Sequence, residues 1–247
     1  MFTRLLVGLD GSPRADAAFE QAVVLGERFH STIIVAHVGE GGGVDGPAML
    51  DRARERVLAA GLVAEVVERT GVPDEVLAEL AKEADAVLVG RRGVTSRNTL
   101  GPTVTALIRS AECCVIVCAG LPSPMRSCAV AFDGRDTSHR ALELAVRFAS
   151  IVDSTVHVIH AAEDHEAGLK VVGIAEAVLS MQRVAFVTYV EPGRPGEVIA
   201  RVIKRIHCDA LFAGAHVARD PTRPSGGIVS HAEEILRHTE IPVLVQP

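Results

Sequence analysis

The chain has 247 residues, 48% of them hydrophobic, and a mean hydropathy of +0.28, which is enough apolar material for a buried core and excludes disorder over most of its length. The net charge of -6 and the pI of about 5.9 give no general attraction to nucleic acid or anionic lipid. No uncharged apolar run approaches the roughly 18 residues that span a bilayer, so we expect a soluble, cytoplasmic protein with neither a nucleic-acid nor a membrane partner.

Short runs of apolar and β-branched residues follow one another through the first half of the chain. They span residues 4–9, 32–38, 63–67, 86–89 and 114–118. Because these runs are nearly all apolar and do not alternate, they are typical of parallel strands covered on both faces. The stretches between them are amphipathic, which indicates helices.

The first helix signal follows the first strand directly. Ser12 is a favourable N-cap and Pro13 a favourable first helical residue. Apolar residues then recur at i, i+3, i+4 and i+7 from Phe19, which predicts a helix with one face on the core.

These signals occur twice in the chain, in the same order. The segments 5–12, 31–38, 71–80, 85–90 and 114–117 return as 128–135, 154–161, 193–202, 209–214 and 242–245. The offset is 123 at the first two pairs, 122 at the third, 124 at the fourth and 128 at the last, so the second copy carries four extra residues in the loop after its fourth strand. Repeats of this kind predict two domains, 1–121 and 126–247, joined by a short proline-containing linker.

Alternating strands and helices predict an α/β fold in which each copy forms a parallel sheet with helices on both faces. In such doubly wound sheets, ligands bind at the carboxyl ends of the strands, where the winding reverses. Two glycine-containing loops follow the first and fourth strands, "GLDGSP" and "GRRG".

The second of these loops, residues 90–103, supports two interpretations. Its glycines permit close backbone approach, the next helix N-terminus attracts anions, and Arg91 adds positive charge, which together suit a phosphate. Asp10 would then accept hydrogen bonds from an exocyclic amine or a ribose hydroxyl. Equally, the glycines can serve a tight turn, Asp10 a cap and the arginine a solvated surface.

A tandem of two such units, each opening with a strand that ends in Asp-Gly, the first closing with "GRRG…LG…RSAECCVIV", resembles the universal stress protein family in its two-domain form. The resemblance covers essentially the whole chain. It implies five-stranded sheets in the order 3-2-1-4-5, with strands one and four side by side. It also implies that the final strands of the two halves pair across a two-fold axis, which gives an internal pseudo-dimer.

Members of this family that bind ATP carry Gly, two residues, Gly, nine residues, then Gly-Ser or Gly-Thr, and this motif holds the ribose and phosphates. The first copy keeps Gly90 and Gly93, but only seven residues precede Gly101, and Pro102 stands where the hydroxyl residue belongs. Proline lacks the N–H that a phosphate would use, while Thr103 offers a hydroxyl one position later. The resemblance also implies adenine contacts at the ends of strands one and two, here at Leu9, Asp10 and Val38.

The second copy departs further from the motif. Gly214 remains, Val217 replaces the second glycine, and Ser230 matches the hydroxyl position without the glycine before it. Asp133 and Ala161 match the adenine positions. The resemblance therefore favours the first copy as the nucleotide site and a structural turn in the second.

The function implied is that of a stress-response protein that binds ATP, or ADP or AMP, with or without Mg²⁺, mainly in its N-terminal domain, as a regulatory module and a homodimer. The alternative is a universal stress protein that binds no nucleotide and acts as a dimeric interaction scaffold. Slow ATPase activity in the same crevice is a third possibility, although the sequence shows no Walker lysine, no Ser-His-Asp set and no metal-ligand spacing. We therefore do not expect an enzyme. A phosphoacceptor receiver domain is disfavoured because no acidic cluster with a partner lysine accompanies Asp10.

Two further features have ordinary explanations. The five cysteines form no CxxC pair and are expected to be buried and reduced. The glycine-rich segment 39–47, absent from the second copy, is either a flap over the crevice or a solvated loop.

Overall fold

A computed structural model of the chain divides into two units, Met1–Ser123 and Pro124–Pro247. The structure describes all residues except 40–44, 92–99, 216 and 220–227, and it describes only the backbone of residues 217–219, 228–231 and 233. Within the described residues no helix is both long and apolar enough to cross a membrane.

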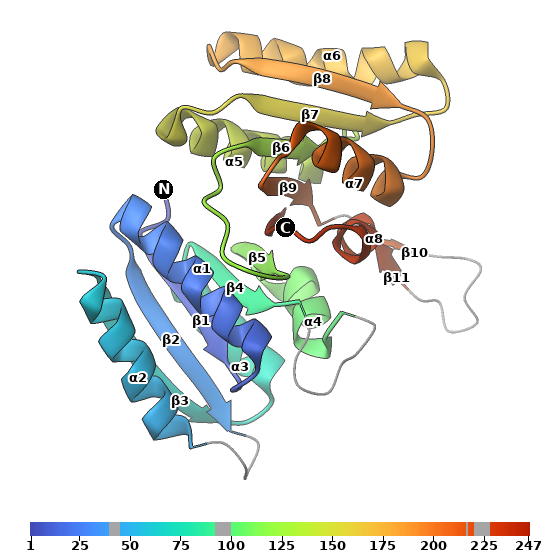
Figure 1. Ribbon diagram of the computed structural model, residues 1–247. Coiled ribbons are helices and arrows are strands. Elements are labelled where there is room, and N and C mark those ends of the chain that lie inside the picture. The colour runs from blue at the N-terminus through green and yellow to red at the C-terminus, as the bar shows by residue number, and fades with distance from the viewer. Residues whose placement is uncertain (40–44, 92–99, 216, 220–227) are drawn as a thin grey trace. The chain divides into compact units, whose positions relative to one another are not determined.

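The first unit alternates strands and helices along the chain (Figure 1). Its elements are β1 (Arg4–Leu9), α1 (Pro13–Phe29), β2 (Thr32–Gly39), α2 (Gly46–Ala59), β3 (Val63–Thr70), α3 (Pro73–Leu80), the 3₁₀ turn η1 (Ala81–Glu83), β4 (Ala86–Gly90), α4 (Pro102–Ser110) and β5 (Cys114–Cys118). All of its strand pairs are parallel, and their order is β3-β2-β1-β4-β5. The order 3-2-1-4-5 that the family resemblance implies is therefore confirmed, although β3 runs three residues beyond the predicted 63–67.

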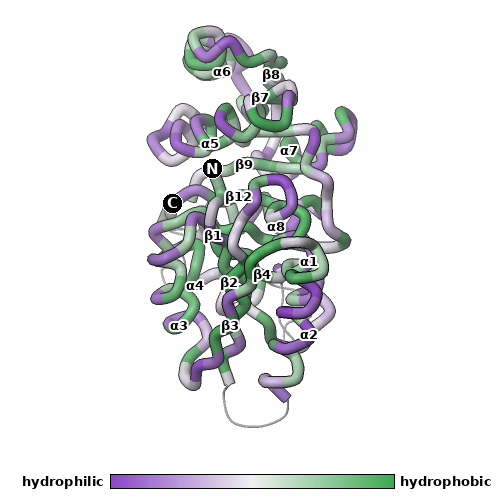
Figure 2. Tube along the Cα trace, turned by 90° about the vertical axis from the view of Figure 1, so that its left-hand side faces the viewer, coloured by the Kyte–Doolittle hydropathy of each residue, from purple (hydrophilic) through white to green (hydrophobic). Residues whose placement is uncertain are grey.

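The helices of the first unit cover both faces of its sheet. Helix α1 packs on β1 and β4 and α2 on β2 and β3, whereas α3 packs against α4 on the other face. The central strands are consequently buried almost completely, as their continuous apolar sequences predict. Figure 2 shows this contrast, with hydrophobic colour on β1, β2 and β4 and hydrophilic colour on α2.

The second unit repeats this plan. Its elements are β6 (Cys128–Ala131), α5 (Asp136–Val152), β7 (Val156–Ala161), α6 (His165–Met181), β8 (Phe186–Glu191), α7 (Pro195–Ile206), β9 (Ala210–Gly214), β10 (Val217–Arg219), β11 (Ile228–Ser230), α8 (His231–His238) and β12 (Val243–Gln246). The parallel pairs β7–β8, β6–β7, β6–β9 and β9–β12 give the same strand order. The antiparallel pair β10–β11 has no counterpart among the described residues of the first unit, and it lies where the repeat offset placed the additional residues.

The same anchor holds the first strand of each unit. In the first unit the Asp85 carboxylate accepts hydrogen bonds from the backbone N–H groups of Thr3, at 2.6 Å, and Arg4, at 2.9 Å. In the second unit Asp209 accepts from the N–H of Ser127, at 2.7 Å. The "DA" pair that recurs in the sequence is thus explained by strand anchoring, because both aspartates satisfy backbone donors at the start of strand one.

Candidate functional site

The carboxyl end of β1 forms a tight turn into α1. Gly11 adopts a φ of 76°, and Ser12 caps the helix by accepting a hydrogen bond from the N–H of Ala15 at 3.1 Å. The exposed Asp10 accepts a hydrogen bond through Oδ1 from the N–H of Ser12, at 2.9 Å. Its second oxygen, Oδ2, forms no hydrogen bond with any residue that the structure describes. Asp10 therefore shapes the turn, and one oxygen of its exposed carboxylate has no partner among the described residues.

A histidine ties the ends of β1 and β2 together. His37 lies beside Leu9 in the parallel register, and its Nδ1 donates to the Leu9 carbonyl at 2.9 Å. The carbonyl can only accept, so the proton must be on Nδ1. The Leu9 carbonyl, at a predicted adenine position, is thus already engaged by the protein, while the next residue of β2, Val38, is only half-buried.

The second unit contains the same histidine contact. His160 lies in β7 as His37 does in β2, and its Nδ1 bonds the carbonyl of Phe132 at 2.8 Å. The sequence analysis missed this pair, although both histidines occupy the same position of an aligned repeat. Their duplication indicates a structural role at the strand ends.

The glycine that ends β4 is required by packing. A Cβ added to Gly90 would lie 2.7 Å from both the carbonyl carbon and the carbonyl oxygen of Arg14, in the first turn of α1. Gly214 meets the backbone of Thr137 in the same way, at 2.5 Å. Because both units need this close approach, glycine at this position does not by itself indicate a ligand.

Arg91 does not lie on an open surface. It is only 4% exposed, its N–H donates to the carbonyl of Cys118 at 2.8 Å, and its carbonyl accepts from the N–H of Gly101 at 3.1 Å. A solvated Arg91, one of the two alternatives from the sequence, is therefore wrong, because the side chain is buried, and the Arg91 backbone connects the start of the loop to its end. Phosphate binding by Arg91 stays a prediction. Gly93 lies outside the described residues, as do residues 40–44 of the glycine-rich segment.

Helix α4 begins as the sequence predicts. Gly101 is the N-cap residue with extended backbone, Pro102 is the first helical residue, and the N–H of Thr105 bonds the Gly101 carbonyl at 3.1 Å. Pro102 has no N–H, so Thr103 and Val104 supply the first-turn donors that lack a partner within the helix. The half-buried Thr103 also carries the hydroxyl proposed from the sequence.

Arg14 brings a cation to the same edge of the sheet, and the sequence analysis missed it. Its Nη1 donates to the carbonyl of Ala119 at 2.6 Å, directly after β5, which places the partly buried guanidinium at the carboxyl ends of the strands. The repeat offset of 123 aligns Arg14 with Thr137, which has no charge. The available signal was a basic residue in the helical turn directly after the Asp-Gly pair.

The corresponding crevice of the second unit is chemically different. Arg135 takes the place of Ser12; its N–H donates to Asp133 Oδ1 at 3.0 Å, and its guanidinium lies 3.6 Å from Asp133 Oδ2. The β10–β11 ladder pairs Val217 with Ser230, the residue before α8. The backbone of Val217 and Ser230, which would have to bind phosphate, is thus paired in the β10–β11 ladder. Asp133, which would have to contact the adenine, already faces the guanidinium of Arg135.

Residues capable of holding a metal ion do not gather here: across the described part of the chain, no three His, Cys, Asp or Glu side chains form such a group. The cysteines Cys114, Cys118, Cys128 and Cys208 are buried and unlinked, as expected, whereas Cys113 is only half-buried.

Comparison with known proteins matches both units. The model of the universal stress protein family matches residues 1–119 and 125–247. A universal stress protein from Synechocystis sp. is 24% identical over 203 residues, which are 79% of this chain and 70% of that protein. The crystal structure of a universal stress protein from Archaeoglobus fulgidus has a TM-score of 0.77 at 19% identity, covering 99% of this chain and 98% of that one. A functionally unknown protein from Pseudomonas aeruginosa has a TM-score of 0.72 at 18% identity, covering 99% and 92% of the two chains.

Proposed function

The chain belongs to the universal stress protein family, since the family model matches both of its units, and on this premise we propose that its first unit binds an adenine nucleotide, ATP or ADP, as a regulatory module. The ligand would lie at the carboxyl ends of β1, β2 and β4. The proposal includes a cytoplasmic protein without enzymatic turnover, in which two chains form a homodimer.

The observation that carries this proposal is the chemical difference between the two crevices. In the first unit, Asp10 has a carboxylate oxygen without a partner among the described residues, and Arg14 lies at the same strand ends. In the second unit, Asp133 faces Arg135, and Thr137 takes the place of Arg14. At the first site an amine or ribose hydroxyl can therefore find an acceptor without a described partner, and a phosphate can find the Arg14 guanidinium. At the second site, among the described residues, the cation Arg135 and the acceptor Asp133 face each other.

The residues of the first unit suit a nucleotide in part. The N–H groups of Thr103 and Val104 and the guanidinium of Arg14 can bind phosphate oxygens, and Asp10 can accept from the sugar or base. Pro102 removes one of the donors that the family motif supplies. We therefore expect weaker phosphate binding than an intact motif would give. Any Mg²⁺ would have to be held chiefly by the phosphates, because no described carboxylate cluster is available.

The direct test is to denature freshly purified protein and identify any released nucleotide by chromatography and mass spectrometry, followed by calorimetric titration with ATP, ADP and AMP. Asp10→Ala should abolish binding. Asp10→Asn, which keeps the acceptor for the Ser12 N–H, should weaken binding about tenfold or more, since it removes a charged acceptor. The matched variant Asp133→Asn should leave affinity unchanged, and unchanged affinity in both Asp10 variants would refute the placement of the site.

A protein without nucleotide favours the second candidate, an interaction scaffold. The β10–β11 ladder supports this alternative for the second unit, because it commits the backbone of Val217 and Ser230 to each other. A purified protein that releases no nucleotide and gives no titration heat with ATP would establish the scaffold as the better proposal.

A further inference from the structure

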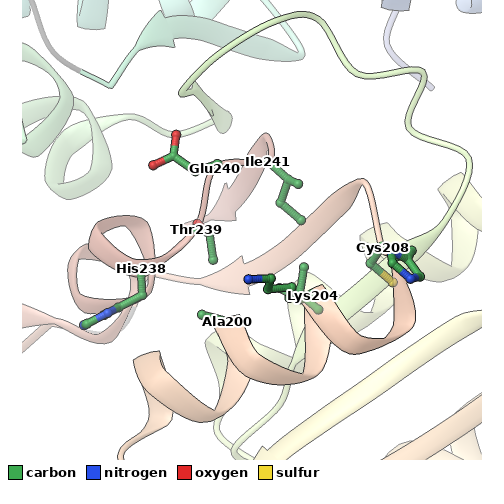
Figure 3. Close-up of a pocket in the computed structure, with 9 residues that line it drawn as sticks. Ala200, Lys204, Cys208, His238, Thr239, Glu240 and Ile241 are labelled. Atoms are coloured by element: carbon green, nitrogen blue, oxygen red, sulfur yellow. The ribbon is translucent and has the colours of Figure 1, made fainter.

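The second unit contains a pocket that the nucleotide proposal does not use. Its volume is about 390 Å³, within the range of roughly 300–1,000 Å³ that is common for small-molecule sites. It opens beside the C-terminal ends of α7 and α8 (Figure 3). The lining residues are Ala200, Ile203, Lys204, His207, Cys208, His238, Thr239, Glu240 and Ile241.

The packing of the two helices explains why the pocket exists. At the start of α7, an added Cβ on Gly196 would lie 2.9 Å from Cγ of Glu234 and 3.0 Å from Cδ2 of His238, so α8 passes very close there. Helix α8 then ends at His238, while α7 continues to Ile206 and turns into β9 through His207, whose φ is 55°. One helix thus stops while the other continues, and the pocket lies beside the last turns of α7.

The interior of the pocket is mainly apolar. Ile203 and Cys208 are each 5% exposed, and Ile241, from the segment before β12, also lines the pocket. The Cys208 sulfur lies 3.2 Å from the hydroxyl of Ser127, and burial raises the pKa of its thiol. Cys208 therefore contributes an uncharged surface, suited to the hydrocarbon part of a ligand.

One cation projects across this apolar surface. In Figure 3 the side chain of Lys204 extends along the pocket with its ammonium group toward Thr239, while the carboxylate of Glu240 points away from it. No carboxylate in the described part of the chain forms an ion pair with Lys204. The pocket thus combines an apolar body with an ammonium group that has no anionic partner there.

From this geometry we propose that the pocket binds a small organic acid with a single carboxylate and an apolar body, as in a medium-chain fatty acid. The carboxylate pairs with Lys204, and the hydrocarbon chain packs against Ile203, Cys208 and Ile241. Charge-assisted hydrogen bonding fixes the orientation and apolar burial supplies much of the affinity. A cationic amphiphile is disfavoured because its ammonium would have to approach that of Lys204.

This inference is independent of the proposed nucleotide site. The pocket lies where the chain enters β9 and β12, at the amino ends of the strands of the second unit, whereas the nucleotide crevice lies at the carboxyl ends in the first. Failure of either proposal leaves the other standing.

The test uses octanoate as the probe and octylamine as its cationic counterpart. Octanoate is titrated into the ¹⁵N-labelled full chain, the amide resonances of Ala200 and Thr239 are followed, and the dissociation constant is measured by calorimetry. Lys204→Met removes the charge at an exposed position. The repeat provides the matched control Lys82→Met, because Lys82 and Lys204 are related by the offset of 122 that joins segments 71–80 and 193–202. Ala200→Leu fills the pocket without changing any charge.

We expect octanoate to shift the two amides and octylamine to leave them unchanged. Lys204→Met should weaken octanoate binding by about tenfold, the usual value of a hydrogen bond between charged groups; Ala200→Leu should also weaken it, and Lys82→Met should not. The proposal is overturned if octanoate leaves the pocket amides unchanged, if octylamine binds equally well, or if Lys82→Met and Lys204→Met have equal effects.

Discussion

Replacement of Gly90 by alanine tests whether glycine is needed at the end of β4 for packing against α1, even when no phosphate is bound. In the native structure the new methyl group would lie 2.7 Å from the carbonyl carbon and oxygen of Arg14, whereas ordinary contact begins near 3.4 Å. Helix α1 and β4 would have to separate by about 0.7 Å, the difference between these distances. The obstructing atoms belong to the backbone, so no change of rotamer can relieve the contact.

The size of the effect follows from two opposing contributions. Overpacking a well-packed interior costs about 1–3 kcal/mol. Replacing glycine with alanine returns about 0.4–1 kcal/mol, because the unfolded chain becomes less flexible. We expect Gly90→Ala to lower the free energy of unfolding of the first unit by about 1–2 kcal/mol, or its melting temperature by roughly 4–10 °C.

Urea unfolding without nucleotide measures this change. Circular dichroism follows both units, while the fluorescence of Tyr189, the only tyrosine in a chain without tryptophan, follows the second unit. Gly39→Ala at the end of β2 is the matched control, because a methyl group there would meet no atom of the described residues within 4 Å. If Gly90→Ala unfolds at the same urea concentration as the wild type and the control, the glycine does not serve packing and our reasoning is wrong.

Two further predictions concern titratable groups. Burial raises the pKa of Asp85, but the hydrogen bonds from Thr3 and Arg4 outweigh burial, and the pKa is lowered overall from its ordinary 3.8. The stability that the Asp85 carboxylate contributes is therefore complete above pH 3.8 and is lost as the pH falls through its lower pKa in the folded protein. Asp85→Asn, compared with the exposed control Asp51→Asn, should therefore reduce the loss of stability on acidification, measured by acid unfolding. An unaltered acid profile would contradict the role of Asp85 in holding the start of β1. Burial also raises the pKa of the Cys113 thiol to about 11 and that of the Cys118 thiol to about 12. Because the thiolate is the reactive form, iodoacetamide at pH 7.5 should label these two cysteines only after denaturation. Rapid labelling of either cysteine in the native protein, located by mass spectrometry, would contradict this prediction.

Two parallel sheets covered by helices could be predicted from the sequence because continuous apolar runs, helical periodicity and the internal repeat all indicate alternating strands and helices, one set in each half of the chain. The strand order itself followed only from the resemblance to the universal stress protein family. The side-chain and backbone contacts at the candidate site could not be predicted from the sequence. The approach of Gly90 to Arg14 and the bond from Arg14 to Ala119 join residues far apart in the chain, and their existence depends on how closely helix and sheet pack. The β10–β11 pair was missed because three-residue strands are too short to show a periodic pattern.

Comparison of the two copies separates what the fold requires from what a ligand requires. Gly90 and Gly214 make the same close contact with a helix backbone, and the bond from His37 to Leu9 has its equivalent in the second unit. A residue that makes the same contact in both copies is explained by the architecture, even when it belongs to a motif associated with phosphate. Arg14 has no such explanation, because the second copy folds in the same way with threonine at that position. The evidence for a nucleotide therefore rests less on the glycines that first suggested it than on Asp10 and Arg14, whose chemical setting differs between two crevices of the same design.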